Sequence, residues 1–293
     1  MPYKSVFRPD LFAGQTLMVT GGGSGIGRCL AHELVSLGAQ VVILGRNAEK
    51  LETVACEIRE DGGDVTTQVC DIREEASVVA AIEAALAKFG QIDGLVNNAG
   101  GQYRTPLHTI STRGFEAVVR NNLTGGFIFM REVFNRWMAD NGGAIVNMIA
   151  DIWNGWPDFA HSGAARGGMW TLTESAACEW AANGVRVNAV APGGIASSGF
   201  DTYAPEIQYK LFEYTRRVPQ QRFGTEAEVA AAITYLLSPA AAYITGSCIR
   251  VDGGAPNARQ TWTLAESHRN KPYEGFHRSQ MPEVLRRGRQ GER

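Results

Sequence analysis

Cysteine patterns that would mark a disulfide framework or a metal site are missing from this sequence. The five cysteines (Cys29, Cys56, Cys70, Cys178 and Cys248) are odd in number, widely spaced and free of any Cys-x-x-Cys or Cys/His pattern. This arrangement excludes the usual zinc motifs and predicts reduced, mostly buried thiols in a reducing compartment. We therefore expect no metal ion.

Long apolar runs and an excess of one charge are missing as well. No run of about 18 apolar residues occurs, and the first residues, MPYKSVFRPDLFAGQ, lack the apolar stretch of a signal peptide. The chain ends in GER rather than in a peroxisomal SKL-type signal. The formal net charge is −2, which gives no general attraction to nucleic acid. We expect a cytoplasmic protein without a membrane or nucleic-acid partner.

The sequence does contain a regular alternation of two patterns. Seven short apolar segments read TLMVT, VVILG, VTTQVCD, GLVNN, AIVNMI, VRVNAVAP and CIRVDGG. Helical periodicity lies between them, at 25–37, 48–60, 74–88, 113–140, 161–182 and 226–238. Short apolar strands alternating with helices predict an α/β fold, a doubly wound, Rossmann-type parallel sheet of about seven strands with helices on both faces.

This rhythm ends at Gly254. We therefore expect one catalytic domain over residues 1–254 and a C-terminal extension over 255–293 that orders only against a neighbouring subunit. Residues 197–223 are polar, aromatic and weakly periodic, which favours a mobile segment over a site.

The first predicted strand leads directly into TGGGSGIGR, residues 20–28, and then into a helix. Gly21, Gly25 and Gly27 let the backbone turn tightly and approach a pyrophosphate, whose charge is favoured at the N-terminus of a helix. A structural turn is the alternative, but the position between a strand and a helix favours dinucleotide binding.

The end of the second strand distinguishes between the two nicotinamide dinucleotides. A carboxylate there would bind the ribose 2′-hydroxyl of NAD, but the chain reads LGRN and places Arg46 at that point. Together with Arg28, it would flank a 2′-phosphate, which favours NADP(H) as the cofactor. The alternative is that both arginines merely face water.

Four ordered motifs carry a family resemblance: TGGGSGIG, NNAG at 97–100, NLTG at 122–125 and RVNAVAPGG at 186–194. Together they resemble the short-chain dehydrogenase/reductase family over about residues 11–254. The resemblance implies that the NNAG turn supports the sheet beside the cofactor, that Asp71 binds adenine, and that the segment after Pro192 holds the nicotinamide carboxamide. The cofactor-binding residues that it implies are Thr20, Gly21, Gly23, Ser24, Gly25, Ile26, Gly27, Arg28, Arg46, Asp71, Ile72, Asn97, Ala99, Gly100, Arg166, Pro192, Gly193, Ile195 and Ser197.

The catalytic residues depart from that family. Its members usually use Ser, Tyr and Lys, the last two spaced Tyr-x-x-x-Lys, together with an Asn on the preceding helix. Aligned on LTESAACEWA at 172–181, the Tyr position holds Ser162, the Lys position Arg166 and the Ser position Ala150, while Asn122 remains. An arginine keeps a cation for the ribose hydroxyls but is too basic to release a proton at neutral pH.

One branch of the family shares this replacement. The segments HSGAARGG, NNAGGQ, NLTG and SPAAAYITG resemble those of the peroxisomal trans-2-enoyl-CoA reductases, and the related 2,4-dienoyl-CoA reductases also lack the usual Tyr. The resemblance implies hydride transfer to a carbon–carbon double bond conjugated to a thioester. Such a site must stabilise negative charge on the thioester oxygen before the α carbon is protonated. The predicted catalytic residues are Asn122, His161, Ser162 and Arg166.

The source of that proton stays open. Trp170 stands where the branch commonly has a Tyr proposed as the acid, and an indole cannot titrate in that role. His161 is one candidate because imidazole titrates near neutral pH, and a hydrogen-bonded core histidine is an equal alternative. Weaker candidates are Asp151, Tyr103, Tyr203 and Tyr214. The aromatic side chains Trp153, Trp156 and Trp170 line an acyl pocket or serve only as packing.

Three functions compete at this point. The first is an NADPH-dependent reductase of a trans-2-enoyl-CoA. The second rests on a resemblance to the bacterial dehydrogenases of acyclic-terpene degradation, which act on citronellol or citronellal. The third, from another class, is a catalytically silent NADP(H)-binding redox sensor. The family resemblance also implies a homodimer or homotetramer formed through the helices near 113–140 and 161–182.

Overall fold

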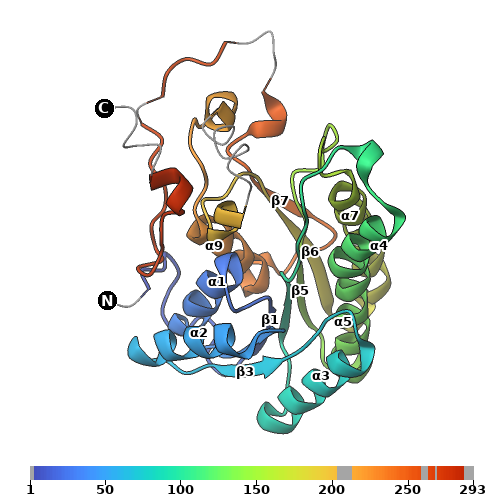
Figure 1. Cartoon of the computed structure of the whole chain (residues 1–293). Coiled ribbons are helices and arrows are strands. Elements are labelled where there is room, and N and C mark those ends of the chain that lie inside the picture. Colours follow the sequence, from blue (N-terminus) through green and yellow to red (C-terminus); the bar gives the residue numbers. More distant parts are fainter. Residues whose placement is uncertain (1–2, 203–212, 259–262, 268, 287–293) are drawn as a thin grey trace.

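The computed structural model describes residues 3–202, 213–258, 263–267 and 269–286. This part of the chain is built around a seven-stranded parallel sheet in the order β3-β2-β1-β4-β5-β6-β7 (Figure 1). The predicted doubly wound fold is confirmed. The strand order runs one way from β1 to β3 and the other way from β4 to β7. In sheets of this kind, ligands bind beyond the carboxyl ends of the strands where the order reverses, here β1 and β4. The strands are β1 (Thr16–Thr20), β2 (Gln40–Gly45), β3 (Thr66–Val69), β4 (Gly94–Asn97), β5 (Gly143–Met148), β6 (Val185–Pro192) and β7 (Cys248–Val251).

Helices cover both faces of this sheet (Figure 1). One face carries α1 (Gly25–Ser36), α2 (Ala48–Glu60) and α9 (Glu226–Leu237), and the other carries α3 (Glu75–Phe89), α5 (Gly125–Val133) and α7 (Ala160–Trp180). Alternate residues of each strand serve the two layers: Leu17 and Val19 belong to one core cluster and Met18 to the other. Because both faces are buried, the inner strands are largely apolar, whereas the edge strand β3 (TTQV) is polar and only partly buried.

The single helix predicted over 113–140 is a run of segments. Two π-helical turns, η2 (Arg120–Thr124) and η3 (Phe134–Met138), join α4 (Thr112–Val119), α5 and α6 (Ala139–Asn141). π-helical turns inside helices often occur at functional sites, because they turn a side chain out of the regular helical register. The turn η2 contains Asn122, the one residue of the family's catalytic set that this sequence retains.

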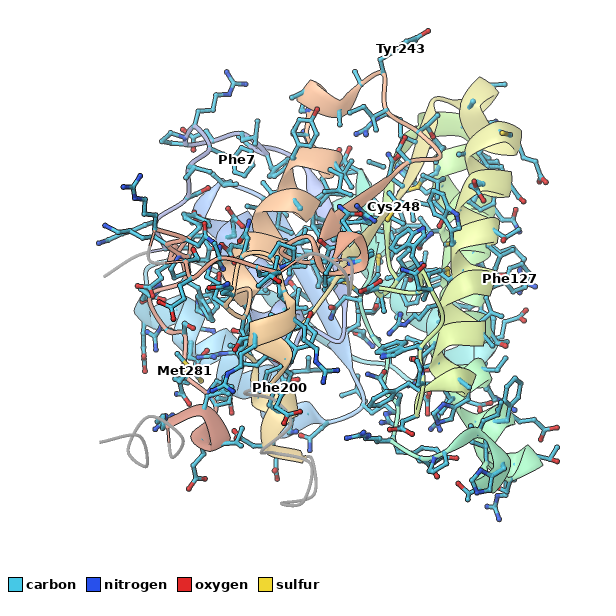
Figure 2. The ribbon with its side chains drawn as sticks, turned by 90° about the horizontal axis from the view of Figure 1, so that it is seen from above. Phe7, Phe127, Phe200, Tyr243, Cys248 and Met281 are labelled. Carbon is cyan, nitrogen blue, oxygen red and sulfur yellow. The ribbon has the colours of Figure 1, made fainter. Side chains whose placement is uncertain are left out.

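The described part of the C-terminal extension packs on its own chain, and its expected contact with a second subunit stays a prediction. Phe276 is 3% exposed and stacks on Tyr3, with 5.9 Å between the ring centroids. Farther along, the backbone N–H of Val284 donates to Asp201 in η5 (Ser198–Thr202), 3.1 Å away. Figure 2 shows Met281 of the extension and Phe200 of η5 on the same side of the molecule. The buried apolar partners therefore come from the same chain.

Two further expectations are only partly covered by the described residues. Within the segment 197–223, residues 203–212, including the candidate Tyr203, lie outside the described part of the chain. Among the helices that are described, none has both the length and the apolar character required to cross a membrane.

Candidate active site

The residues predicted to bind a cofactor follow the carboxyl ends of neighbouring parallel strands. The glycine loop follows β1, Arg46 follows β2, Asp71 and Ile72 follow β3, the NNAG turn ends β4, and Gly193 to Ser197 follow β6. In a parallel sheet these ends share one edge, so the fold brings the predicted set together.

The glycine loop has the shape of a phosphate cradle. A Cβ on Gly27 would lie 2.3 Å from the carbonyl oxygen of Gly21, so only glycine allows the first turn of α1 to approach the loop. Gly21 itself has φ +69°, a conformation that favours glycine. Ser24 is the N-cap of α1, is exposed and makes no side-chain cap hydrogen bond, which leaves the first N–H groups of the helix for a ligand. The loop therefore fits a dinucleotide pyrophosphate.

Thr20 holds this loop in place through its side chain. Its hydroxyl donates to the carbonyl of Val96 at 3.1 Å and accepts from the N–H groups of Asn98 and Ala99, both at 3.0 Å. The amide of Asn98 returns a hydrogen bond to the carbonyl of Thr20 at 2.9 Å. The hydroxyl expected at the cofactor is thus engaged between β1 and β4, where it positions the loop.

The two arginines predicted to read a 2′-phosphate differ in their surroundings. Arg46 is exposed at the end of β2. Arg28 instead donates two hydrogen bonds, of 2.7 and 2.9 Å, to Glu57 of α2, and its guanidinium lies 5.0 Å from the centre of the Phe276 ring. Glu57, which sequence reasoning missed, therefore neutralises Arg28 within the fold, and the role of Arg28 at a 2′-phosphate stays a prediction.

The adenosine end and the NNAG turn are also tied into the protein. Arg73 pairs with Asp71 at 2.5 Å, and this pairing lowers the pKa of Asp71 to about 2. A Cβ on Gly125 would lie 2.8 Å from the side chain of Ile72, so the start of α5 packs closely over Ile72. The buried side chain of Asn97 donates to Asn147 at 2.9 Å, which supports the sheet as the resemblance implies.

Beyond β6, the backbone is fixed by neighbouring segments. The N–H of Gly193 donates to the carbonyl of Val251 at 3.0 Å, and Ile195 forms a bridge with Gly224. The N–H of Gly194 donates to the hydroxyl of Tyr214 at 2.9 Å. Pro192 ends β6, and the carbonyl of Ser197 accepts from the N–H of Phe200 at 3.0 Å. This stretch is therefore held at the sheet edge, as a carboxamide-binding segment requires.

Arg166 lies buried at the centre of the catalytic end. Its Nη1 donates to the carbonyl of Met148 at 2.5 Å, and its Nη2 lies 3.5 Å from Oδ1 of Asn122. The residue is 7% exposed, and burial lowers the pKa of Arg166 to about 10, which leaves it charged at neutral pH. A Cβ on Gly100 would lie 2.3 Å from Nη2, so the glycine of the NNAG turn makes room for the guanidinium.

Asn122 closes around the next glycine of that turn. Its Oδ1 accepts from the N–H of Gly101 at 2.8 Å, and its Nδ2 donates to the Gly101 carbonyl at 2.9 Å. These two hydrogen bonds make Asn122 a positioning residue for the turn and for Arg166 rather than a free donor to substrate. Sequence reasoning missed Gly101, and the only available signal was its place directly after NNAG.

Two polar side chains in the first turn of α7 are fully buried, those of His161 and Ser162. Within the described part of the chain, both ring nitrogens of His161 and the Oγ of Ser162 make no hydrogen bond. The His161 ring is held edge-on against Tyr103, with 4.6 Å between the centroids. Buried polar groups are nearly always hydrogen-bonded, so these atoms are the natural partners of a ligand.

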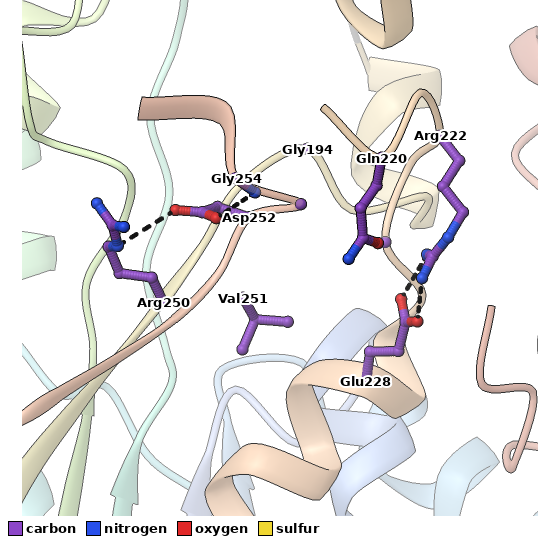
Figure 3. A pocket seen from close by; sticks show the side chains of 10 residues that line it. Gly194, Gln220, Arg222, Glu228, Arg250, Val251, Asp252 and Gly254 are labelled. Atoms are coloured by element: carbon purple, nitrogen blue, oxygen red, sulfur yellow. Dashed lines mark hydrogen bonds and ion pairs between the residues drawn. The ribbon is translucent and has the colours of Figure 1, made fainter. Parts of the chain in front are cut away.

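Two buried carboxylates lie near the ends of β5 and β7. Oδ1 of Asp151 and Oδ2 of Asp252 have no hydrogen-bond partner, and Nε of Arg250 is 3.6 Å from the latter. Burial, and then the charge of Asp252, raises the pKa of Asp151. A cavity of about 290 Å³ beside Asp252 is bounded by Arg222, which pairs with Glu228 (Figure 3). Sequence reasoning missed Asp252, whose only signal was a carboxylate directly after the last strand.

The tryptophans proposed to line an acyl pocket serve largely as packing. Trp153 and Trp170 pack on the core cluster under α5 and α7, and Trp156 lies against Phe159 with 5.1 Å between the ring centroids. The guanidinium of Arg250 lies 5.4 Å from the centre of the Trp153 ring. An indole at position 170 therefore has a structural explanation.

A Rossmann-type sheet with a glycine loop after β1 and an inward-facing polar cluster on α7 defines a nicotinamide-dependent oxidoreductase. A family model described as enoyl-(acyl carrier protein) reductase matches residues 21–256. The chain belongs to the short-chain dehydrogenase/reductase family, whose members bind a nicotinamide cofactor and act on small molecules.

Particular relatives point to two kinds of chemistry. The chain is 34% identical to a peroxisomal 2,4-dienoyl-CoA reductase from Danio rerio, over 86% of this chain and 85% of that one. It is 35% identical to a probable 2,4-dienoyl-CoA reductase from Bacillus subtilis, over 82% and 96%. The structure of a citronellol catabolism dehydrogenase from Pseudomonas aeruginosa has a TM-score of 0.79 and 57% identity, covering 87% of this chain and all of that one.

Proposed function

We propose that this protein is an NADPH-dependent reductase of a carbon–carbon double bond conjugated to a thioester, as in a trans-2-enoyl-CoA. One observation carries the proposal: the position of the family's catalytic Tyr is occupied by Ser162, whose buried hydroxyl, like the ring nitrogens of the buried His161, has no hydrogen-bond partner among the described residues. Such a site offers hydrogen-bond donors but lacks, at the family's position, the phenol that protonates an alkoxide in a carbonyl reductase.

The residues that would hold the cofactor are the glycine loop with Ser24, Arg46 at the 2′-phosphate, and Arg166 at the nicotinamide ribose. The open N-terminus of α1 and the glycine-only contact of Gly27 with Gly21 support this assignment. A guanidinium suits ribose hydroxyls because it presents several N–H donors in a fixed plane. When bound, the reduced nicotinamide supplies a hydride for the β carbon of the substrate.

The side chains of α7 stabilise the charge that then develops on the thioester oxygen. Ser162 donates through its hydroxyl and His161 through a ring N–H, both from positions from which water is excluded. Arg166 keeps a positive charge beside them, because its hydrogen bonds to Met148 and Asn122 fix it in one place. Asn122 maintains the turn that shapes this corner.

The proton for the α carbon has a candidate source in Asp151. Its pKa is raised by burial and by the neighbouring Asp252, so the carboxyl holds its proton more readily than an exposed aspartate. It follows Ala150, the position that holds the family's Ser, and therefore lies at the catalytic edge of β5. Asp151→Asn should lower turnover more than cofactor affinity, whereas an unchanged turnover would assign the proton to solvent.

The test is a direct comparison of substrates. Purified protein should oxidise NADPH with crotonyl-CoA or longer trans-2-enoyl-CoAs, followed at the absorbance of the reduced nicotinamide. A matched control uses the saturated acyl-CoA, which cannot accept hydride. Turnover of an alcohol such as citronellol with NADP⁺, with none of the enoyl-CoAs, would overturn the proposal.

That outcome is the second candidate function, an alcohol or aldehyde dehydrogenase of the acyclic-terpene type. The 57% identity to the citronellol catabolism dehydrogenase favours it. In this case Ser162 would have to serve a carbonyl or alcohol oxygen without a phenol beside it. Binding of NADPH without turnover of any enoyl-CoA, aldehyde or ketone would instead favour a redox sensor.

A further inference from the structure

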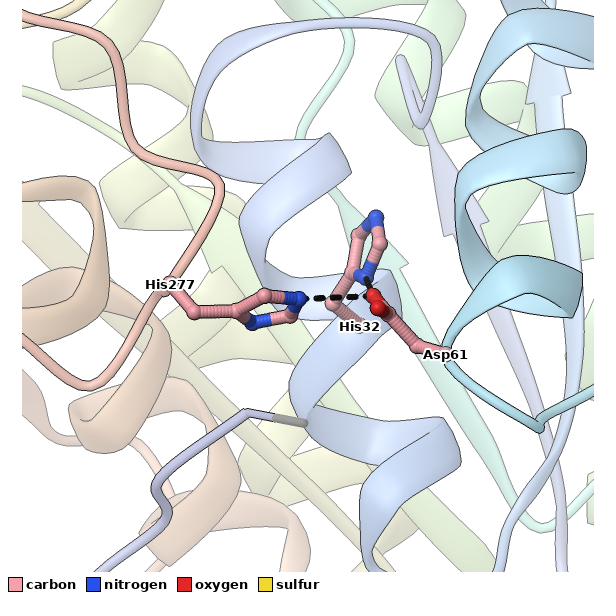
Figure 4. Close-up of side chains that lie close together, drawn as sticks. All are labelled: His32, Asp61 and His277. Atoms are coloured by element: carbon pink, nitrogen blue, oxygen red, sulfur yellow. Dashed lines mark hydrogen bonds and ion pairs between the residues drawn. The ribbon is translucent and has the colours of Figure 1, made fainter. Parts of the chain in front are cut away.

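Three side chains from distant parts of the sequence meet on the outer face of α1 (Figure 4). His32 lies on α1, Asp61 directly follows α2, and His277 lies in the C-terminal extension, 216 positions from Asp61. Nε2 of His277 is 2.7 Å from Oδ2 of Asp61, and Nδ1 of His32 is 3.4 Å from the same oxygen. One donor atom from each residue lies within 4.8 Å of the others.

Hydrogen bonding does not explain both contacts of the His32 ring with carboxylates. Its Nε2 lies 3.3 Å from Oε2 of Glu57, while its Nδ1 faces Asp61. A neutral imidazole carries a single N–H and can therefore donate to only one of two carboxylates. If that proton is on Nε2, the lone pair of Nδ1 points toward a carboxylate oxygen, and the two repel. A cation between Nδ1 and Oδ2 would remove this repulsion.

We propose that Nδ1 of His32, Oδ2 of Asp61 and Nε2 of His277 form a binding site for a divalent transition-metal ion of the zinc class. Two imidazoles and one carboxylate are a ligand set that zinc uses, with a water at the fourth position. Zinc–ligand bonds of about 2.0–2.2 Å require His277 and Asp61 to separate by less than about 1 Å from their present hydrogen bond.

The neighbouring groups complete the arrangement. Glu57 accepts from the other nitrogen of His32, the role that carboxylates commonly play behind a metal-bound histidine. Arg278 is the competing cation: it donates to Oδ2 of Asp61 at 2.9 Å and to Oδ1 at 3.0 Å. The metal replaces only the first of these bonds, because Arg278 also pairs with Glu60 and keeps Oδ1.

The consequence of the site is mechanical. A metal there joins α1, whose N-terminus receives the pyrophosphate, to the C-terminal extension that reaches Asp201 beside the carboxamide-binding segment. It also fixes the stretch that places Phe276 on the guanidinium of Arg28. The extension would then be held by a coordinate bond in addition to its ion pairs and buried aromatic ring.

The test is a metal titration of the full chain in a Cys56→Ser, Cys178→Ser background, because these two exposed thiols also bind zinc. After treatment with a chelator, Co²⁺ should give one saturable equivalent with the intense visible absorption of a four-coordinate site. Zn²⁺ should displace it and raise the Tm. His277→Ala should weaken binding by at least about tenfold, and Glu57→Gln by about tenfold or more.

Two variants separate a metal site from an ordinary ion pair. His277→Cys keeps a zinc ligand but cannot form the histidine–aspartate hydrogen bond, so it should restore Co²⁺ binding with a thiolate charge-transfer band. His108→Ala, which removes an exposed histidine elsewhere, should leave binding unchanged. The absence of saturable binding in the parent, or equal affinity in His277→Ala, would show that the cluster is only a salt bridge.

Discussion

The dinucleotide end and the catalytic end of this molecule differ in how their polar side chains are satisfied. Around the glycine loop, Thr20 and Arg28 each have protein partners at 2.7 to 3.1 Å. At the start of α7, His161 and Ser162 are fully buried, and their side chains have no hydrogen-bond partner among the described residues. In the first region, these polar side chains are already paired with the protein, and the region offers backbone groups to a ligand. The second region leaves its side chains unpaired until a ligand arrives.

This difference explains why one end keeps the family pattern and the other does not. The cradle depends on glycines and backbone geometry, as shown by the contact that a Cβ on Gly27 would make. The catalytic end depends on individual side chains, and Ser162 and Arg166 replace others without disturbing α7. Substitutions at the catalytic end should therefore reduce activity and leave stability intact, and substitutions around α1 should do the opposite.

The largest effect is expected for Arg166→Met. The variant removes the fixed positive charge and the bond to the carbonyl of Met148, so kcat/KM should fall by about 10³, the upper end for one stabilising group. Because a buried charge with few partners contributes little stability, the Tm should stay equal or rise. Arg166→Lys is the matched control and should recover part of the activity. Normal kinetics in the Met variant would assign Arg166 a purely structural role.

The next effect is expected for Ser162→Ala, with kcat/KM lower by about 10²–10³. The hydroxyl has no hydrogen-bond partner in the described part of the chain, so its loss should leave no group there unsatisfied and the Tm should not fall. Thermal unfolding and steady-state kinetics on the same preparation check both halves of this statement. A clear loss of stability would mean that Ser162 has a structural partner in the folded protein.

The sequence was sufficient to predict the architecture because the strands carry an unambiguous signal. The middle residues of β1 and β2, 17–19 and 41–44, are apolar and buried, which is typical of a sheet covered on both faces. The two π-helical turns were not predicted, since one extra residue in a turn hardly changes the helical pattern of a long segment. The packing of the extension on its own chain was not predicted because Phe276 stacks on Tyr3, at the other end of the chain.

For the candidate site, the sequence located the residues but not their partners. Motif positions predicted that Asn122 and Arg166 lie together, and Nη2 of Arg166 is 3.5 Å from Oδ1 of Asn122. Nothing in the pattern indicated that Asn122 would form hydrogen bonds with the backbone of Gly101, or that Glu57 would pair with Arg28. Those contacts depend on side-chain directions across helices that are far apart in sequence, which spacing along the chain does not encode.

A pH-dependent effect on stability is expected from Glu33, on the well-partnered side of α1. Burial raises the pKa of Glu33 to about 7, although Ser5 and Tyr3 donate to it. Between its ordinary value of 4.5 and about 7, the folded state holds a proton that the unfolded chain has released. The free energy of unfolding should therefore decrease as pH rises through this window, by up to about 3 kcal/mol.

Glu33→Gln should remove this dependence. Urea unfolding at pH 5 and pH 8 should show a smaller decrease for the variant than for the parent protein, with the contributions of all other groups cancelling in the difference. Glu116→Gln, at an exposed position on α4, is the matched control. Parallel pH curves for Glu33→Gln and the parent would show that this carboxyl ionises normally in the fold.

The smallest effect concerns the choice of cofactor and compares the two arginines directly. Arg46 is exposed at the end of β2, so Arg46→Asp removes a cation and adds a charge that repels a 2′-phosphate. The NADPH/NADH ratio of kcat/KM should fall by about 10- to 100-fold, the value of a hydrogen bond to a charged group. Arg28→Met should leave that ratio unchanged and lower the Tm, because Glu57 loses the guanidinium and keeps only His32 as a partner. If Arg28→Met changes the ratio as much as Arg46→Asp does, the guanidinium of Arg28 leaves Glu57 when the cofactor binds. The side chains of the dinucleotide end would then also depend on a ligand for their pairing.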